Sequence, residues 1–171
     1  MTNDTFVMLA KYNRAANEAM GRVIKTLDAD AWDKQFPAFF KSVRELCSHI
    51  YIADFVWLKR FEGLREFKTL QGEFFTQSFS FKDVLFADKN DYLAKRPELD
   101  AKLEAFVNEL TDGDLQKSLS YKDSGGNPHE QNFGGLLLHT FNHAVHHRGM
   151  ISFCLELLGK DNDYNSLVQV L

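Results

Sequence analysis

The chain is poor in cysteine and proline, the residues that cross-link or interrupt a small protein. It has 2 cysteines and 3 prolines among 171 residues. Cys47 and Cys154 each lie in apolar, helix-like sequence, so no disulfide framework is expected. This composition excludes the small secreted scaffolds that depend on several disulfide bonds for stability.

Long apolar runs and dense blocks of positive charge are also missing. No apolar stretch approaches the roughly 18 residues that a membrane-spanning helix requires, so no membrane association is expected. The formal net charge is −4, and without a basic patch we expect no nucleic-acid partner. Residues 1–5 carry no basic segment followed by an apolar run, which predicts a cytoplasmic protein without a secretory signal.

Apolar residues recur at steps of three and four along most of the chain, which is the periodicity of amphipathic helices. The Phe-rich stretch at 64–87 is expected to be a crossover with a short helix near 81–86. Pro97 should break the third helix or begin its main part, since proline removes a backbone donor. The predicted long helices lie at about residues 4–27, 38–62, 89–110 and 132–158.

The remaining segments complete this prediction. Residues 119–129 are rich in Asp, Ser, Gly, Asn and Pro, which favours a small hairpin or an ordered loop. The segment after Gly159 should fold back onto the helices. The sequence therefore predicts an all-α protein, a four-helix bundle with one long crossover, in a single domain over residues 1–171.

Four of the six histidines lie within nine residues of the last predicted helix. His143 and His147 are four residues apart and project from one face of that helix. Together with the distant His49 they form a plausible three-nitrogen metal site with one coordination position open. The pair His139/His143 fits as well, however, and spacing alone does not separate His146 from His147.

Four segments form a recognisable series: Tyr12-Asn13 with Asn17, the run Ser48 to Phe61, the loop Tyr121 to Gly126 and the run Leu136 to Gly149. Their sequences and their order resemble the DinB-like four-helix proteins. The resemblance implies a divalent metal ion, zinc or nickel, bound by His49, His143 and His147. His139, His146 and Tyr12 would then line the pocket beside the metal.

The resemblance also carries expectations about activity and assembly. It implies a homodimer and an enzyme that acts on a small molecule, as a hydrolase or as a transferase that uses a low-molecular-weight thiol. The alternative is a non-catalytic metal-binding or stress-response protein. Met150 departs from the family pattern, because many relatives have glutamine there, and we expect it to change the polarity of the neighbouring pocket.

Metal-assisted hydrolysis also needs a base near the bound water. Glu45 lies one turn before His49 on the same helical stripe and is the candidate base, with Glu130 as another. Asp54 should face elsewhere and serve the structure. Arg148 is expected to pair with a carboxylate on a neighbouring helix or to bridge a dimer.

Overall fold

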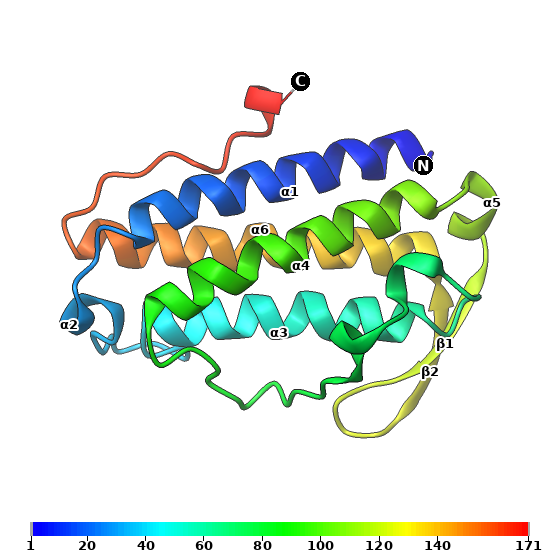
Figure 1. Cartoon of the computed structure of the whole chain (residues 1–171), viewed down its shortest axis with the longest axis horizontal. Helices are drawn as coiled ribbons and strands as arrows, with labels where there is room; N and C mark the ends of the chain where they lie inside the picture. The colour runs from blue at the N-terminus through cyan, green and yellow to red at the C-terminus, as the bar shows by residue number, and fades with distance from the viewer. Residues whose placement is uncertain (1, 171) are drawn as a thin grey trace.

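The computed structural model describes residues 2–170 and is built from four long helices (Figure 1). α1 and α6 run in one direction along the molecule, and α3 and α4 run in the other. α1 contacts α4 and α6, while α3 contacts α6 and α4. This arrangement confirms the predicted all-α four-helix bundle with one crossover. The four helices are α1 (Asn3–Ile24), α3 (Val43–Phe61), α4 (Lys89–Glu109) and α6 (Phe133–Leu157).

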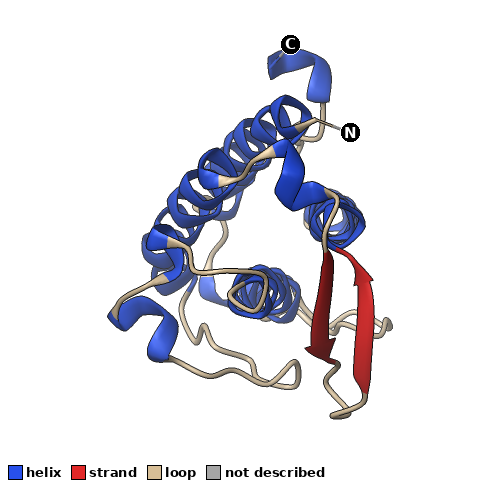
Figure 2. Ribbon diagram, turned by 90° about the vertical axis from the view of Figure 1, so that its right-hand side faces the viewer, coloured by secondary structure: helices blue, strands red, loops and turns tan. Residues whose placement is uncertain are grey.

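Short elements connect the long helices. The predicted hairpin is present as two antiparallel strands in which Tyr121 pairs with His129, and it lies to one side of the bundle in the end-on view (Figure 2). Over residues 2–170, no helix combines the length and apolarity that crossing a membrane demands. The short elements are α2 (Ala29–Trp32), α5 (Asp112–Leu115), β1 (Ser118–Lys122) and β2 (Pro128–Asn132), with three single turns of 3₁₀ helix.

The crossover between α3 and α4 differs from the prediction. Residues 81–86 form no helix, and the helical turns lie earlier, at Lys68–Leu70 and Glu73–Thr76. Because α3 and α4 are parallel, the crossover must travel back along the bundle, over about 28 Å for a helix of 19 residues. Residues 62–88 cover this distance without a long helix or a strand, as irregular chain with two turns of 3₁₀ helix.

Pro97 also behaves differently from the prediction, because α4 continues through it without a break. Proline cannot donate to the carbonyl of Leu93, which costs about 3 kcal/mol in a helix interior. Tyr92, Leu99 and Leu103 lie on both sides of Pro97 and are fully buried. Their burial, at about 2 kcal/mol for each large apolar side chain, is sufficient to keep α4 continuous.

A network of buried polar side chains joins the helices inside the bundle. Arg96 on α4 donates to Asp54 on α3 at 2.6 Å and to Asp100 one turn further along α4. Asn17 on α1 donates to the same Asp100 carboxylate at 2.8 Å. All four side chains are nearly inaccessible to solvent. Asp54 is therefore part of an internal ion pair, which agrees with the structural role expected for it.

Arg148 extends this network to α6, with partners that differ from those predicted. It is fully buried and donates to the side-chain oxygens of Asn13 and Asn17 on α1, where the sequence suggested a carboxylate or a dimer contact. Its backbone carbonyl accepts the hydroxyl of Tyr164 at 3.2 Å, so the segment after α6 folds back onto the bundle as expected.

Candidate metal centre

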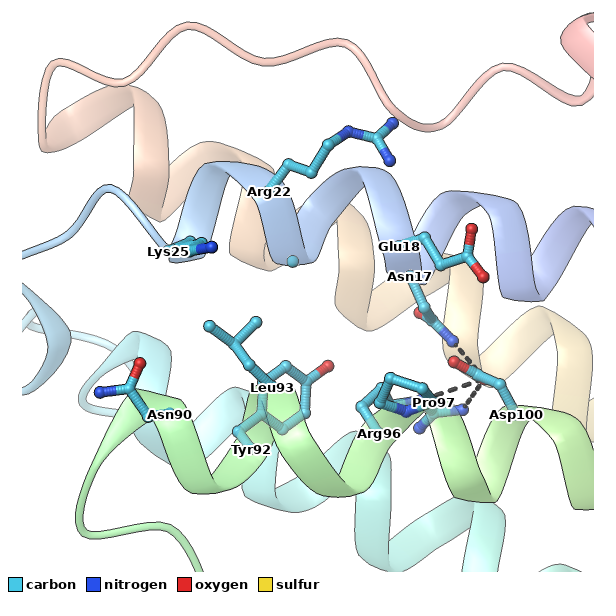
Figure 3. A pocket seen from close by; sticks show the side chains of 11 residues that line it. Asn17, Glu18, Arg22, Lys25, Asn90, Tyr92, Leu93, Arg96, Pro97 and Asp100 are labelled. Carbon is cyan, nitrogen blue, oxygen red and sulfur yellow. Dashed lines mark hydrogen bonds and ion pairs between the residues drawn. The ribbon is translucent and has the colours of Figure 1, made fainter.

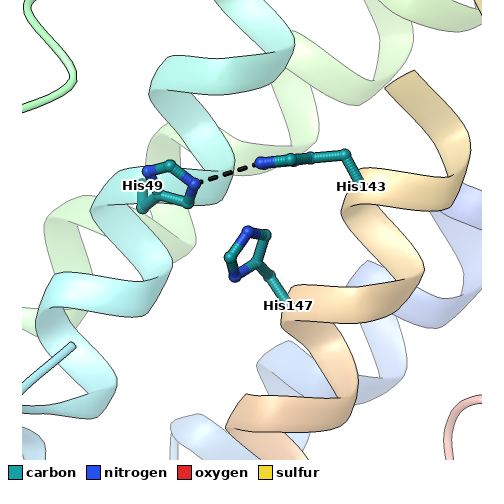
Figure 4. Close-up of side chains that lie close together, drawn as sticks. All are labelled: His49, His143 and His147. Atoms are coloured by element: carbon teal, nitrogen blue, oxygen red, sulfur yellow. Dashed lines mark hydrogen bonds between the residues drawn. The ribbon is translucent and has the colours of Figure 1, made fainter. Parts of the chain in front are cut away.

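α3 and α6 pack side by side and bring three histidines together. His49 projects from the middle of α3 towards His143 and His147, which lie one turn apart on α6 (Figure 4). The Nε2 atoms of His49 and His143 are 3.1 Å apart. One nitrogen from each of the three imidazoles lies within 4.8 Å of the other two.

Helix capping fixes the two helices that present these histidines. The Ser42 hydroxyl accepts the Glu45 backbone N–H at 3.2 Å and begins α3. The Asn132 side chain accepts the Gly135 N–H at 2.9 Å and begins α6. Each cap satisfies an amide that would otherwise lack a partner, so the start of each helix is well defined. The positions of the histidines along the two axes follow from these starts.

The spacing of the nitrogens fits a divalent metal ion. Two imidazole nitrogens bound tetrahedrally to one zinc ion, at about 2.05 Å each, lie roughly 3.3 Å apart. The 3.1 Å between His49 and His143 is close to this value. A hydrogen bond at this distance needs a proton on one nitrogen only, whereas a metal needs both nitrogens bare. The three side chains could hold one metal ion.

The electrostatics favour neutral imidazoles, which is the form that binds metal. Burial, followed by the neighbouring histidines, lowers the pKa of His49 and of His143 to about 4. Burial, followed by His143 and His49, lowers the pKa of His147 to about 3. At neutral pH all three rings are therefore uncharged, and no proton has to leave before a metal binds.

Two phenylalanines enclose the three histidines. Phe40, from the loop before α3, places its ring centroid 4.6 Å from that of His49 and 5.3 Å from that of His147. Phe81, from the crossover, lies 6.0 Å from His49. Sequence reasoning did not single out either residue, since nothing distinguishes them among 16 phenylalanines. Their rings make the surroundings apolar, which strengthens electrostatic interactions at the site.

The outer nitrogens of the three rings have no acceptor. The Nδ1 atoms of His49, His143 and His147 are buried and lack a hydrogen-bond partner among the residues that the structure describes. In most metal sites a carboxylate or a backbone carbonyl accepts a proton from this second nitrogen and orients the ring. Here the orientation of the rings comes from packing against aromatic side chains.

The two competing histidines flank the cluster without joining it. The His139 ring lies 6.0 Å from the His143 ring and 5.5 Å from Trp57. The His146 ring lies 4.8 Å from the His147 ring. Both side chains are exposed, so they border the cluster on its solvent side.

The other predicted site residues have different contacts. The Glu45 carboxylate accepts the backbone N–H of Lys41 at 2.7 Å, at the start of α3. Tyr12 donates to the backbone carbonyl of Asn165 at 2.9 Å. Glu130 is exposed on β2. Within residues 2–170, none of these side chains hydrogen-bonds to the three imidazoles, and the role of Glu45 as a base stays a prediction.

A cavity of about 460 Å³ lies elsewhere, between α1 and α4 (Figure 3). Its wall includes Asn17, Arg96 and Asp100 of the buried network, and Leu93 and Pro97 of α4. The three clustered histidines come from α3 and α6, so this cavity belongs to a different part of the bundle.

Comparison with known proteins identifies relatives that match most of the chain. The model of the DinB family matches residues 1–164. Protein DinB of Bacillus subtilis (strain 168) is 25% identical over 162 residues, which cover 92% of this chain and 88% of the relative. A match over this length extends from the first long helix to the segment after the last one.

Two crystal structures of DinB-like proteins have the same fold. The protein from Bacillus cereus ATCC 10987 superimposes with a TM-score of 0.60 at 18% identity, over 86% of this chain and 88% of the other. The one from Bacillus subtilis gives a TM-score of 0.56 at 15% identity, over 90% and 94%. At these identities the similarity concerns the fold alone.

Proposed function

Because the chain belongs to the DinB family, we propose that it is a divalent-metal-dependent enzyme acting on a small molecule, with His49, His143 and His147 as ligands. The convergence of three imidazole nitrogens within 4.8 Å carries this proposal. Three neutral ligands leave a divalent ion its full charge and a free coordination position, the arrangement typical of catalytic rather than structural zinc. Imidazole nitrogens suit zinc and nickel, which are the proposed metals.

The bound metal would lower the pKa of a water molecule or of a thiol cosubstrate towards neutrality, which supports hydrolysis in the first case and thiol transfer in the second. The chain's own groups have separate tasks. The three imidazoles bind the ion, and the Phe40 and Phe81 rings exclude bulk water from one side. A low-molecular-weight thiol is the proposed cosubstrate of the transferase reaction.

Two side chains are candidates to accept the proton. Glu45 is the base suggested by its place one turn from His49, although its carboxylate now accepts the Lys41 amide. His146 is exposed and its ring is 4.8 Å from the His147 ring. Glu45→Gln and His146→Gln separate them, because the variant that lacks the true acceptor loses turnover while it retains its metal.

A non-catalytic metal-binding protein is the second candidate function. It needs no base, and it is favoured by the Glu45 carboxylate, which accepts the backbone N–H of Lys41. A cytoplasmic homodimer is proposed for either function, on the basis of the family resemblance. Sedimentation of the purified protein and fractionation of cells test the assembly and the location.

Metal content is the first test of the proposed function. Mass spectrometry would be applied to untagged protein purified without a chelator or a nickel column. We expect about one ion per chain, lost in His49→Ala, His143→Ala and His147→Ala and kept in the matched control His139→Ala. The absence of bound metal after reconstitution with zinc or nickel would refute both functions.

Turnover then separates the enzyme from the binding protein. Ester hydrolysis and thiol transfer would be assayed with the metal-loaded protein, with the chelated protein and with His147→Ala. Activity that needs the metal supports the enzyme. A protein that holds its metal tightly but turns over no compound in either assay is the non-catalytic binder.

A further inference from the structure

An apolar cavity of about 640 Å³ opens between the loop before α3 and the second half of α6. Phe36 and Phe40 line it from the loop, Leu46 from α3, and Met150 and Phe153 from α6. No Asp, Glu, Lys or Arg is among its lining residues in the part of the chain that the structure describes. A charged group would lose its hydration there without gaining a partner, so the cavity suits an uncharged group.

The cavity adjoins the three histidines. Phe40 lines it and also contacts the rings of His49 and His147, at centroid distances of 4.6 and 5.3 Å. His146 lines it too, and its ring is 4.8 Å from the His147 ring. A molecule that fills the cavity therefore has one end beside the imidazoles, with Phe40 and His146 at the junction.

We propose that this cavity binds the apolar part of the substrate, an unbranched alkyl or an aryl group, while the reactive polar group lies at His49, His143 and His147. The proposal rests on the metal-dependent function above and adds the substrate class to it. The volume falls within the roughly 300–1,000 Å³ of small-molecule sites, whose walls are mostly apolar with polar groups at a few points. The lining of this cavity is likewise mainly apolar, and its polar groups are the imidazoles at one end.

The rim of the cavity is also apolar. Phe153 is 61% exposed and Leu157 is 59% exposed, and both belong to α6, so a ligand that extends out of the cavity would cover its α6 side. Apolar residues from the loop, α3 and α6 together form the walls of the cavity. A concave surface of this kind can enclose an alkyl chain or an aromatic ring. The continuity with the histidines favours a substrate group over a second copy of the protein as the occupant.

Gly149 offers a way to fill the cavity without disturbing its walls. It lines the cavity, and a Cβ added to it would meet no atom within 4 Å. Gly149→Leu therefore places a side chain in empty space. Gly135→Leu is the matched control on the same helix, because its added Cβ makes only an ordinary contact, 3.6 Å from Asn132 Oδ1, and it does not line this cavity.

The probes are hydroxamic acids with chains from acetyl to octanoyl, titrated calorimetrically into the zinc-reconstituted protein. The hydroxamate binds the metal, and the chain reports on the cavity. Each buried methylene should tighten binding by up to about fourfold until the cavity is full. In Gly149→Leu this gain should be lost while acetohydroxamic acid binds as before, and Gly135→Leu should behave as the unchanged protein.

Failure of this inference can be told apart from failure of the metal site. If acetohydroxamic acid binds and longer chains bind no more tightly, the metal site stands and the cavity proposal is overturned. A dimer whose formation weakens octanoyl binding overturns it as well, because a second copy then occupies the cavity.

A metal-free measurement covers the case in which the protein takes up no metal. Octan-1-ol would be added to protein carrying ¹³C-labelled methionine methyl groups, with the Met150 signal assigned through Met150→Leu. A shift of the Met150 methyl signal in the protein but not in Gly149→Leu supports apolar binding in the cavity even without metal. An unchanged Met150 signal overturns the proposal, whatever the outcome at the histidines.

Discussion

Replacing Arg96 with methionine tests the buried network that links the helices. Arg96 is 3% exposed and donates to both Asp54 and Asp100, which are equally buried. Removing one partner of a buried ion pair costs about 4 kcal/mol, because the remaining charge has neither water nor a counter-ion. The whole domain is stable by only about 5–15 kcal/mol. We therefore expect Arg96→Met to fold with about a quarter or more of its stability lost at pH 7.

The loss should depend on pH in a defined direction. Burial raises the pKa of Asp54 and of Asp100, and Arg96 lowers both. Without Arg96 the folded-state pKa of these carboxyls rises further above the unfolded value of about 3.9. A raised carboxyl pKa destabilises the protein at high pH, and the penalty disappears as the pH falls towards the unfolded pKa. The difference from the unchanged protein should shrink by about 1.4 kcal/mol per pH unit for each carboxyl that is protonated.

Urea denaturation followed by circular dichroism at pH 7, 6 and 5 measures both effects. Arg14→Met is the matched control, since Arg14 also binds two carboxylates, Glu18 and Glu104, each at 3.0 Å, but is 46% exposed. Exposed pairs contribute about 0–1 kcal/mol, so this variant should lose little stability at any pH. Equal losses in the two variants, or a loss in Arg96→Met that stays constant from pH 7 to 5, would refute the reasoning.

Three further measurements address other parts of the molecule. Zinc at about 100 times its dissociation constant should stabilise the protein by about 2.7 kcal/mol and raise Tm by about 5–10 °C, reversibly with chelator; an unchanged Tm counts against the site. Burial raises the pKa of the Asp114 carboxyl, but hydrogen bonds, led by that from Arg65, outweigh burial and hold it well below its usual value. Asp114→Asn should thus lose about 2 kcal/mol of stability at pH 7. In urea titrations this difference from the unchanged protein should narrow below pH 3.8, the ordinary pKa of the carboxyl, and a constant difference would argue against the role of these hydrogen bonds. Gly134→Ala should destabilise by about 1–3 kcal/mol, because its Cβ would lie 2.8 Å from the Leu115 carbonyl oxygen, whereas Gly135→Ala should not; similar midpoints in thermal melts would contradict this.

The long helices could be predicted because their signal is local. Apolar residues at steps of three and four specify which face is buried, whatever that face packs against. The predicted limits 132–158 agree with α6 at Phe133–Leu157 to within one residue at each end. The crossover could not be predicted in this way, because its irregular course depends on what its side chains contact on the helices that it passes.

Pro97 is a second place where the local sequence signal did not predict the structure. A proline inside a helix carries a local free-energy penalty, and this led to the expectation that Pro97 would break the helix or begin its main part. The burial of side chains on both sides of Pro97 depends on tertiary packing, and the free energy that it contributes exceeds the penalty of the proline. Asn13 and Asn17 gave a usable signal, since two polar side chains lie on the apolar stripe of α1, but their partners Asp100 and Arg148 depend on how the helices pack.

Spacing on α6 left the choice between neighbouring histidines open for a related reason. His139, His143, His146 and His147 all lie within a narrow sector of the helix surface. Which of them meets His49 depends on how α6 is rotated about its axis relative to α3. The family resemblance selected His143 and His147, and these are the two that converge with His49 in the structure.

The two polar clusters of this protein differ in a way that bears on function. In the buried network each charged side chain makes at least one hydrogen bond and the ion pairs join α3 to α4, although single atoms such as Arg96 Nη1 and Asp54 Oδ1 have no partner within the described residues. In the histidine cluster three buried Nδ1 atoms have no partner within residues 2–170, and two Nε2 atoms face each other at 3.1 Å. Three facing neutral rings form no ion pair, and the two Nε2 atoms share at most one hydrogen bond, so the cluster contributes little to the stability of the fold. A metal ion would bind the nitrogens that face one another, and it is their convergence that indicates a functional site.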